Sequence, residues 1–187
     1  MRKSLIACLA LAVALLARAA GIGLKPGLWE VRLVKQVVDG RDMSAQLSQA
    51  STQMEQAMAN MPPQERARMQ AMLKQHGVGF GHQGGIRICV TPQMAQRNAP
   101  VIDERGRCKP TQVTHSGNRT TYAFSCSSKG VTTTGTGVST IAGNRVTTRS
   151  DTTTETGNGE KHVVQSESEM TYVGPDCGDV KPAPAPK

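Results

Sequence analysis

Hydrophobic and polar residues alternate with a period of two near the start of the chain. Residues 28–35 read LWEVRLVK. Trp29, Val31 and Leu33 therefore fall on one side of an extended segment, and charged residues fall on the other. Such alternation is typical of a strand with one buried face. We predict a first strand here, with Trp29, the only tryptophan of the chain, as an anchor of the core.

The period changes to that of a helix after residue 43. Apolar side chains now recur at steps of three and four, in a segment rich in Gln and Ala, at Leu47, Ala50, Met54, Met58 and Met61. Two prolines end this pattern, and Pro63 suits the first turn of a second helix that runs to about Gln75. The sequence thus predicts a Met-rich helical hairpin over about residues 44–76, inserted between the first and second strands.

The second half of the chain carries turn signals at regular intervals. The dipeptide Gly-Asn, which readily supplies the positive φ of tight turns, occurs at residues 117–118, 143–144 and 157–158. Segments typical of strands lie before, around, between and after these turns, at residues 86–90, 108–126, 131–141, 145–156 and 161–173. This spacing predicts an antiparallel meander.

These elements define the predicted fold class, which is α+β and mostly β. We expect a curved antiparallel β-meander of about six to seven strands, with the Met-rich helical hairpin inserted between the first and second strands. The later strands are rich in threonine, which favours strands but supplies little apolar area. A single curved sheet with one wet face suits this shortage better than a thick sandwich does.

The cysteines indicate a disulfide framework. Cys108 and Cys126 lie equally far from Gly117, so a hairpin that turns at this glycine places their sulfurs opposite each other. With Cys8 set aside as part of the leader, four cysteines permit three connectivities. The symmetry of the hairpin favours Cys108–Cys126, which leaves Cys89–Cys177.

The N-terminus is typical of a secretory signal peptide. Arg2 and Lys3 precede an apolar run over residues 5–17, and small residues follow at 19–21. The run is shorter than the roughly 20 residues of a transmembrane helix. We predict a signal peptide at residues 1–20, a single disulfide-stapled β-rich domain at 21–180, and a disordered tail rich in Pro and Ala at 181–187.

The distribution of charge and the aromatic content argue against a nucleic-acid partner. The formal charge is +8, and removal of Arg2, Lys3 and Arg18 with the leader lowers it to +5. The remaining basic residues are scattered, and the chain has only five aromatic residues, one Trp, two Tyr and two Phe. Nucleic-acid binding normally needs a basic patch with aromatic stacking groups, so we expect no nucleic-acid partner.

Motifs of catalysis are missing from the sequence. The residues at 79–84 read GFGHQG and match G-x-G-x-x-G, but a predicted helix precedes them and a strand follows, the reverse of a dinucleotide site. We interpret residues 77–85 as a flexible linker. No nucleophile elbow, zinc-protease motif, C-x-x-C or P-loop is present. We expect no catalytic residues, no resident cofactor and no enzymatic activity.

The methionines permit two interpretations. Thioether groups are ligands for copper, and His76 and His82 lie nearby, so a periplasmic copper-binding protein is the alternative function. Copper sites of this kind usually bring Met and His together in short clusters, whereas these methionines follow helical spacing. An adaptable apolar surface for packing or for a hydrophobic partner is the interpretation that we prefer.

The order of these motifs resembles a known family. The matching stretches are KPGLWEV at 25–31, MPP at 61–63, ICVTP at 88–92, Cys108-Lys109, SGN at 116–118, Cys126, and Cys177-Gly178. Together they resemble the domain of unknown function 3617 family of exported bacterial proteins, which implies a Gram-negative periplasmic location. The family often ends in Gly-Asp-Cys, whereas this chain reads PDCGD at 175–179. No established activity of the family transfers to any residue.

Our leading hypothesis is a non-enzymatic periplasmic protein with a binding or envelope-associated role. The curved sheet and the helical hairpin would enclose an apolar groove, and lipid or a hydrophobic peptide would be the ligand. The residues predicted to face that ligand are the methionines on the two helices, Met54, Met58, Met69 and Met72.

Overall fold

One antiparallel sheet organises the computed structural model, which describes residues 23–75, 77–82, 84–96 and 108–182. Its strands are β1 (Gly27–Val38), β2 (Arg41–Asp42), β3 (Gly79–Phe80), β4 (Ile86–Val90), β5 (Cys108–Ser116), β6 (Arg119–Ser128), β7 (Val131–Ala142), β8 (Arg145–Glu155) and β9 (Lys161–Gly174). The helices are α1 (Ser44–Ala59), α2 (Pro63–Gln75) and α3 (Pro92–Gln96). The mostly β class and the antiparallel sheet confirm the prediction.

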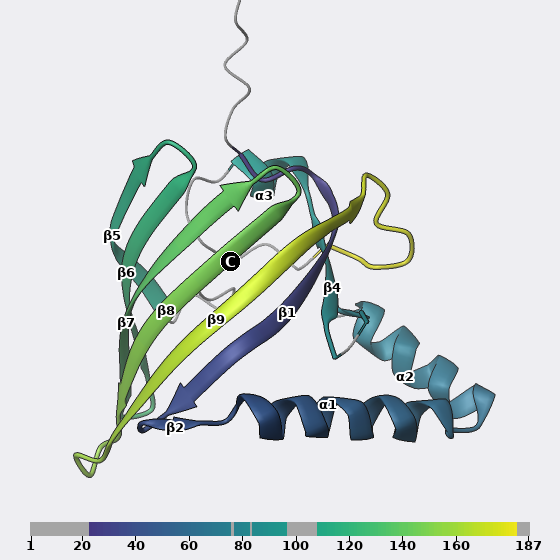
Figure 1. Ribbon diagram of the computed structural model, residues 1–187, viewed down its shortest axis with the longest axis horizontal. Helices are drawn as coiled ribbons and strands as arrows, with labels where there is room; N and C mark the ends of the chain where they lie inside the picture. The colour runs from purple at the N-terminus through teal and green to yellow at the C-terminus, as the bar shows by residue number, and fades with distance from the viewer. Residues whose placement is uncertain (1–22, 76, 83, 97–107, 183–187) are drawn as a thin grey trace, which may run out of the picture.

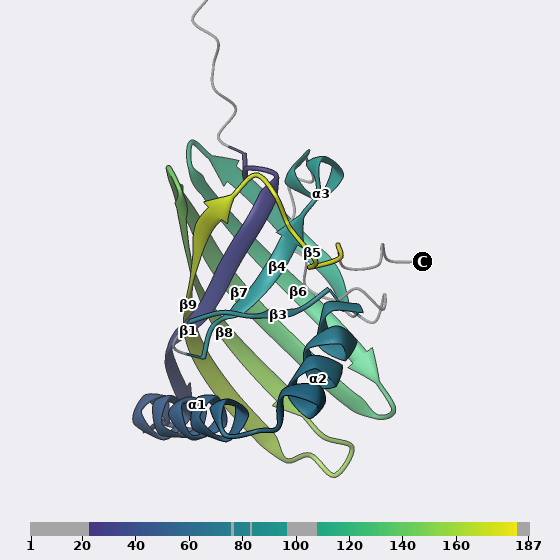
Figure 2. The same cartoon turned by 90° about the vertical axis from the view of Figure 1, so that its right-hand side faces the viewer.

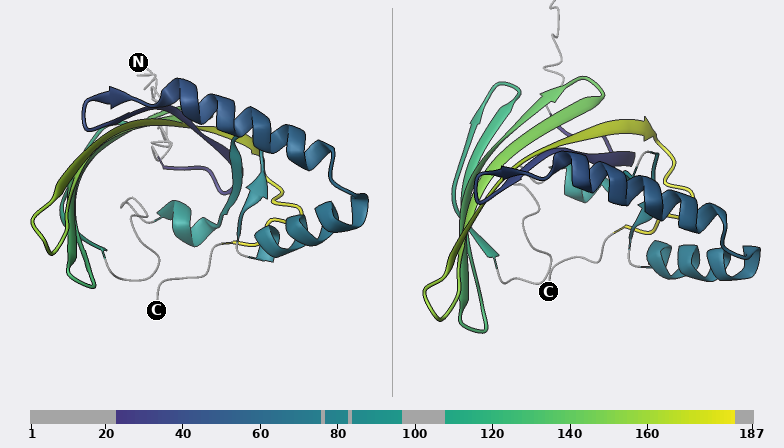
Figure 3. Two further views of the ribbon diagram at one scale, coloured as in Figure 1. Left: turned by 90° about the horizontal axis from the view of Figure 1, so that it is seen from below. Right: turned by 60° about the horizontal axis from the view of Figure 1, so that its bottom comes forward.

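The order of the strands in the sheet is β3-β4-β1-β9-β8-β7-β6-β5, and β2 pairs with β1. Strands β5 to β9 form the predicted meander. The first strand, β1, pairs with the last strand, β9. The sheet bends into an arc and stays open, with α3 on the inside of the curve (Figures 1 and 3). Figure 2 shows α1 and α2 at the lower end of the sheet, near β3.

The sheet has more strands than the predicted six to seven, because β2 and β3 were missed. Each has two residues, and the helical insertion therefore lies between β2 and β3 and not directly between the predicted first and second strands. Residues as few as Arg41–Asp42 and Gly79–Phe80 carry no periodic pattern. They form strands because β1 and β4 supply hydrogen-bonding partners beside them.

The core is centred on Trp29, as predicted. Its side chain is 0% exposed and packs with Val90 and Val146, and partly buried residues of α3 and β9 surround this group. The ring of Tyr172 meets it edge-on, with centroids 5.3 Å apart. The indole Nε1 donates to the backbone oxygen of Lys25 at 2.7 Å. The first strand is therefore held from both sides through one side chain.

The inner face of the later strands compensates for its small apolar area with paired hydroxyl groups. Ser139 lies 2.9 Å from Thr148 on the next strand, and Ser150 lies 2.8 Å from Ser166, measured between side-chain oxygens. The ring of Tyr122 lies over Gly137 and the ring of Phe124 lies over Gly135, where a Cβ would meet the ring atoms. The glycines of β7 thus make room for aromatic residues on β6.

Charged residues occupy the outer face of the sheet. Arg149 donates two hydrogen bonds to the Glu167 carboxylate, at 2.8 and 3.1 Å, and Arg145 lies 3.2 Å from Glu169. Exposed pairs of this kind contribute little to stability, typically below about 1 kcal/mol each. Their arrangement shows that the charged positions of these strands face solvent.

Both predicted disulfides are present. Cys108 pairs directly with Cys126 across β5 and β6, with the turn at Gly117, whose φ is +55°. Cys89 of β4 is joined to Cys177, 88 residues away. Two disulfides are consistent with an exported protein. The predicted signal peptide lies outside the described residues.

The segment after Cys177 packs back on the sheet edge. Val180 is buried and lies against Gly79 of β3, and Pro182 forms a bridge with Cys89. Asp179 accepts a hydrogen bond from Lys74 of α2 at 2.8 Å. Of the tail predicted at 181–187, residues 183–187 lie outside the described residues. This end of the chain thus contacts both β3 and α2.

A histidine and an aspartate join the end of β1 to the start of β9. The His162 Nδ1 lies 2.8 Å from the Asp39 carboxylate, which also accepts the backbone N–H of Val163 at 2.7 Å. Hydrogen bonding to His162 and then to Val163 lowers the pKa of Asp39 below its usual 3.8. The same carboxylate raises the pKa of His162 above its usual 6.5.

Stability is therefore expected to depend on pH through His162. Because its folded pKa is raised, its contribution is fully present below pH 6.5 and is lost as the pH rises through the folded pKa. The Asp39 contribution has the opposite sign, since it is present above pH 3.8 and is lost as the pH falls through the lowered pKa. Urea unfolding should show a smaller loss of stability in His162→Gln than in the parent between about pH 6 and about pH 8, a window that contains the usual histidine pKa and extends above it.

The matched control for this pH experiment is His115→Gln. His115 is an exposed histidine at the β5–β6 turn that contacts Thr120 at 3.0 Å and no carboxylate among the described residues. It should keep the pH dependence of the parent. An identical slope in the parent and in His162→Gln would show that the pair with Asp39 carries no linkage.

Candidate functional site

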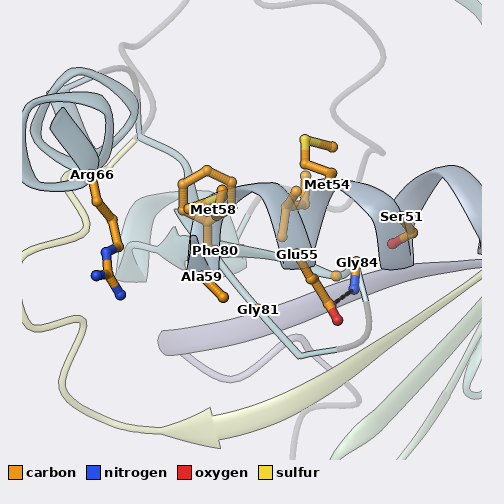
Figure 4. A pocket seen from close by; sticks show the side chains of 11 residues that line it. Ser51, Met54, Glu55, Met58, Ala59, Arg66, Phe80, Gly81 and Gly84 are labelled. Atoms are coloured by element: carbon orange, nitrogen blue, oxygen red, sulfur yellow. Dashed lines mark hydrogen bonds between the residues drawn. The ribbon is translucent and has the colours of Figure 1, made fainter. Parts of the chain in front are cut away.

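An apolar cavity lies where the helical insertion meets the edge of the sheet. Its volume is about 280 Å³. Helix α1, the start of α2, strand β3 and the β3–β4 turn provide its walls, through Ser51, Met54, Glu55, Met58, Ala59, Arg66, Phe80, Gly81, Gly84, Gly85 and Ile86 (Figure 4). Phe80 and Ile86 are paired across β3 and β4. Their side chains share one face of the sheet with Trp29, because Ile86 pairs with Val31 on that face.

The two helices are attached to the body of the protein by few buried groups. Both helices are described in full, and neither contains a buried residue. Met54 is 58% exposed although it lines the cavity. Helical propensity and the two prolines between the helices account for their local structure. Tertiary packing contributes little, so the apolar side chains of α1 remain available for binding.

One end of the cavity is closed by a hydrogen bond between α1 and the β3–β4 turn. The Glu55 carboxylate accepts the backbone N–H of Gly84 at 2.5 Å (Figure 4). Gly84 has a φ of +71°, and its Cα lies so close to Ser51 that any side chain there would overlap the Ser51 hydroxyl. That hydroxyl is buried and has no hydrogen-bond partner within the described part of the chain.

The β3–β4 turn is not the flexible linker that we predicted for residues 77–85. Its backbone N–H groups are bound by carboxylates from two other elements: Glu30 of β1 accepts from His82 at 3.1 Å, and Glu55 accepts from Gly84. Glu30 is in turn paired with Arg87 at 3.2 Å. The prediction was wrong because glycine content reports backbone freedom in the unfolded chain, whereas these carboxylates come from residues remote in sequence.

The other end of the cavity carries a guanidinium group. Arg66, in the first turns of α2, is partly buried and donates to the backbone oxygen of Met61 at 3.4 Å. Across the described residues, no carboxylate lies within ion-pair distance of it. Figure 4 shows Arg66 at one end of the cavity and Ser51 and Gly84 at the other, with Met58, Ala59 and Phe80 between them.

The four methionines predicted to face a ligand are divided by the structure. Met54 and Met58 of α1 line the cavity. Met69 and Met72 of α2 do not, and they are 36% and 56% exposed. Helical spacing located the apolar side of each helix, but it contained no information on which part of each helix reaches the edge of the sheet.

The sequence analysis did not predict several of the residues that line the cavity. Phe80 stands alone among glycines, and Gly81, Gly84 and Gly85 were assigned to the linker. The available signal was a large apolar residue within a glycine run, because glycine permits close approach of another element. Arg66 gave no signal, since it is one of several charged residues on a polar helix.

The copper hypothesis stays a prediction. His76 lies outside the described residues, and His82 is exposed in the β3–β4 turn. Within the described ranges, no group of three His, Cys, Asp or Glu side chains is placed to hold a metal ion.

The same ranges contain no helix with the length and apolar character needed to cross a membrane.

Comparison with known proteins gives a family. Residues 24–177 match the family described as protein of unknown function (DUF3617). A Pseudomonas putida protein, titled "Uncharacterized protein in lpd-3 5'region", is 36% identical over 107 residues, which cover 55% of this chain and 69% of that protein. No solved structure gives a significant match.

Proposed function

The chain belongs to the DUF3617 family, and we propose that it is a non-enzymatic periplasmic protein that binds a hydrophobic ligand in the cavity between α1, α2 and the β3–β4 turn. The observation that carries this proposal is the composition of the cavity wall. Met54, Met58, Phe80 and Ile86 present apolar side chains to a space of about 280 Å³. A space of this size lies near the lower end of small-molecule sites, which begin at about 300 Å³.

The methionines make this cavity adaptable. An unbranched thioether side chain changes rotamer easily and fits apolar groups of different shape. Met58 is partly buried and Met54 is mostly exposed, so a ligand that enters the cavity covers apolar surface that water now reaches. Each Å² of apolar surface removed from water contributes about 25 cal/mol. Binding of an apolar group is favourable without any change in the sheet.

The disulfides support the proposed location. Two bridges among the described residues are consistent with an oxidising compartment outside the cytoplasm. Lipids and unfolded or extended peptides are the common hydrophobic molecules of such a compartment, and a protein with an apolar cavity next to exposed apolar helices suits either class. The absence of a recognisable catalytic motif in the sequence favours binding over catalysis.

The first test is a titration with the neutral dye N-phenyl-1-naphthylamine. The purified protein should give saturable fluorescence with one dye per chain, because the cavity accommodates one small apolar group. Ala59→Trp places an indole at the cavity wall and should weaken dye binding by at least about tenfold, equivalent to 1.4 kcal/mol. Ala59 is exposed on the last turn of α1, so thermal unfolding should change little.

Ala57→Trp is the matched control for the dye titration. Ala57 lies on the same helix, is exposed and does not line the cavity. This variant should bind dye as the parent does. Absence of saturable binding by the parent, or equal weakening by both tryptophan variants, would count against a ligand site in this cavity.

A further inference from the structure

The two ends of the cavity differ in charge, and from this difference we infer the class of ligand: a single-chain amphiphile whose carboxylate head binds Arg66 while its apolar chain lies along Met58 and Phe80. This inference rests on the proposed function, since it requires that the cavity binds an apolar chain. It adds the orientation of the ligand, the charge of its head and the length of its tail.

Orientation follows from the two charged side chains of the cavity wall. Glu55 holds a negative charge at the end formed by Ser51 and Gly84, and Arg66 holds a positive charge at the opposite end (Figure 4). An anionic head is repelled from the first end and attracted to the second. A guanidinium group also matches the geometry of a carboxylate with two parallel hydrogen bonds.

Arg66 has donors left for such a head. Its Nη2 makes one long hydrogen bond, 3.4 Å, to the Met61 backbone oxygen. A guanidinium group carries five N–H donors. The other charged side chain that lines the cavity is Glu55, and its carboxylate already accepts the Gly84 N–H. Arg66 is the cationic group of the cavity wall, and most of its donors have no hydrogen-bond partner among the described residues.

The volume limits the length of the chain. A methylene group occupies about the volume of a water molecule, roughly 30 Å³. A pocket of about 280 Å³ therefore accommodates about nine such groups, the equivalent of one chain. We assign the site to a ligand with one chain of about ten carbons in the protein, and any further carbons extend into solvent past the exposed Met54.

The test uses three ligands with the same ten-carbon chain: decanoate, 1-decanol and decyltrimethylammonium. Each displaces N-phenyl-1-naphthylamine from the full-length mature protein at pH 7.5, where a carboxylate with a usual pKa of about 4.3 is ionised. Decanoate should bind about tenfold more tightly than decanol, as expected for a charge-assisted hydrogen bond, and the cation most weakly. Arg66→Gln should remove the advantage of decanoate and leave the affinity for decanol unchanged.

Two further variants distinguish a specific role of Arg66 from loss of structure. Arg66→Lys keeps the charge and should restore most of the preference for decanoate. Arg68→Gln removes an exposed charge of α2 that does not touch the cavity and should keep the parental preference. Equal affinity of the parent for decanoate and decanol, or equal loss of decanoate binding in Arg66→Gln and Arg68→Gln, would overturn the assignment.

Chain length gives an independent measurement. Each added methylene should tighten carboxylate binding about fourfold up to about ten carbons, and the gain should then level off. A constant gain from eight to fourteen carbons would overturn confinement of the chain in this cavity. If the dye binds but the head group makes no difference, the inference fails while the proposed function stands. If the dye does not bind, both fail.

Discussion

Replacing Trp29 with alanine is expected to lower the free energy of unfolding by about 3–5 kcal/mol, the range for truncation of a large buried aromatic residue. The side chain is fully buried, and its removal leaves a cavity between β1, α3 and β9. It also removes the edge contact with Tyr172 and the hydrogen bond to the Lys25 oxygen. A domain of ordinary stability, about 5–15 kcal/mol, loses a third or more of it.

Urea unfolding followed by circular dichroism measures this effect, because the variant lacks the only tryptophan available for fluorescence. Trp29→Phe should cost less than the alanine variant, since it keeps an aromatic ring in the core and loses chiefly the indole hydrogen bond. Ile86→Ala, on the neighbouring strand but 42% exposed, should cost below about 1.5 kcal/mol. A loss below that value for Trp29→Ala would show that the core does not depend on this residue.

Removing the Cys89–Cys177 bridge by a double alanine substitution is expected to destabilise the protein more than removing Cys108–Cys126. The sequence separations are 88 and 18 residues, and the chain-entropy relation gives about 4.6 and about 3.2 kcal/mol for loops of these lengths. The longer loop has more conformational freedom in the unfolded chain, so its closure contributes more. Urea midpoints of the two double variants test the order.

The Cys89–Cys177 bridge also bears on the proposed site. It holds the segment in which Asp179 pairs with Lys74 of α2 and Val180 packs on Gly79 of β3. Release of this segment should therefore weaken dye binding in the cavity, whereas the Cys108–Cys126 variant, at the far edge of the sheet, should bind dye normally.

The stability measurement has its own contradicting outcome. A smaller loss of stability on removal of Cys89–Cys177 than on removal of Cys108–Cys126 would contradict the entropic account.

The proposed ligand connects the exposed helices with the rest of the fold. The sheet is stabilised by a small aromatic and aliphatic core, by paired hydroxyl groups and by two disulfides, and it does not require α1 and α2 as a cover. Neither helix contains a buried residue, so the apolar side chains of α1 and α2 remain accessible to solvent. A ligand in the cavity would bury part of that surface and hold α1, α2 and the β3–β4 turn together.

Local pattern was sufficient for much of the fold. Alternation placed Trp29 in the core, helical spacing and Pro63 located both helices, and the Gly-Asn pairs located turns of the meander. The symmetry about Gly117 identified Cys108–Cys126, and the remaining pair followed by elimination. Each of these features depends on residues near one another in sequence, whose spacing fixes their geometry.

The site depended on contacts between remote segments, and these were decided by the tertiary structure alone. Whether the glycine-rich stretch was a flexible linker or an ordered strand and turn depended on β4, which pairs with Gly79 and Phe80, and on Glu30 and Glu55, which bind N–H groups of the turn. Whether a methionine faced the cavity or solvent depended on where its helix lies relative to β3 and the β3–β4 turn. The sequence by itself therefore determined the elements, their turns and the disulfides, because local spacing fixes them. Only the folded chain brought Arg66, Met58 and Phe80 to one cavity, because nothing in their spacing encodes the distance between a helix and a sheet edge.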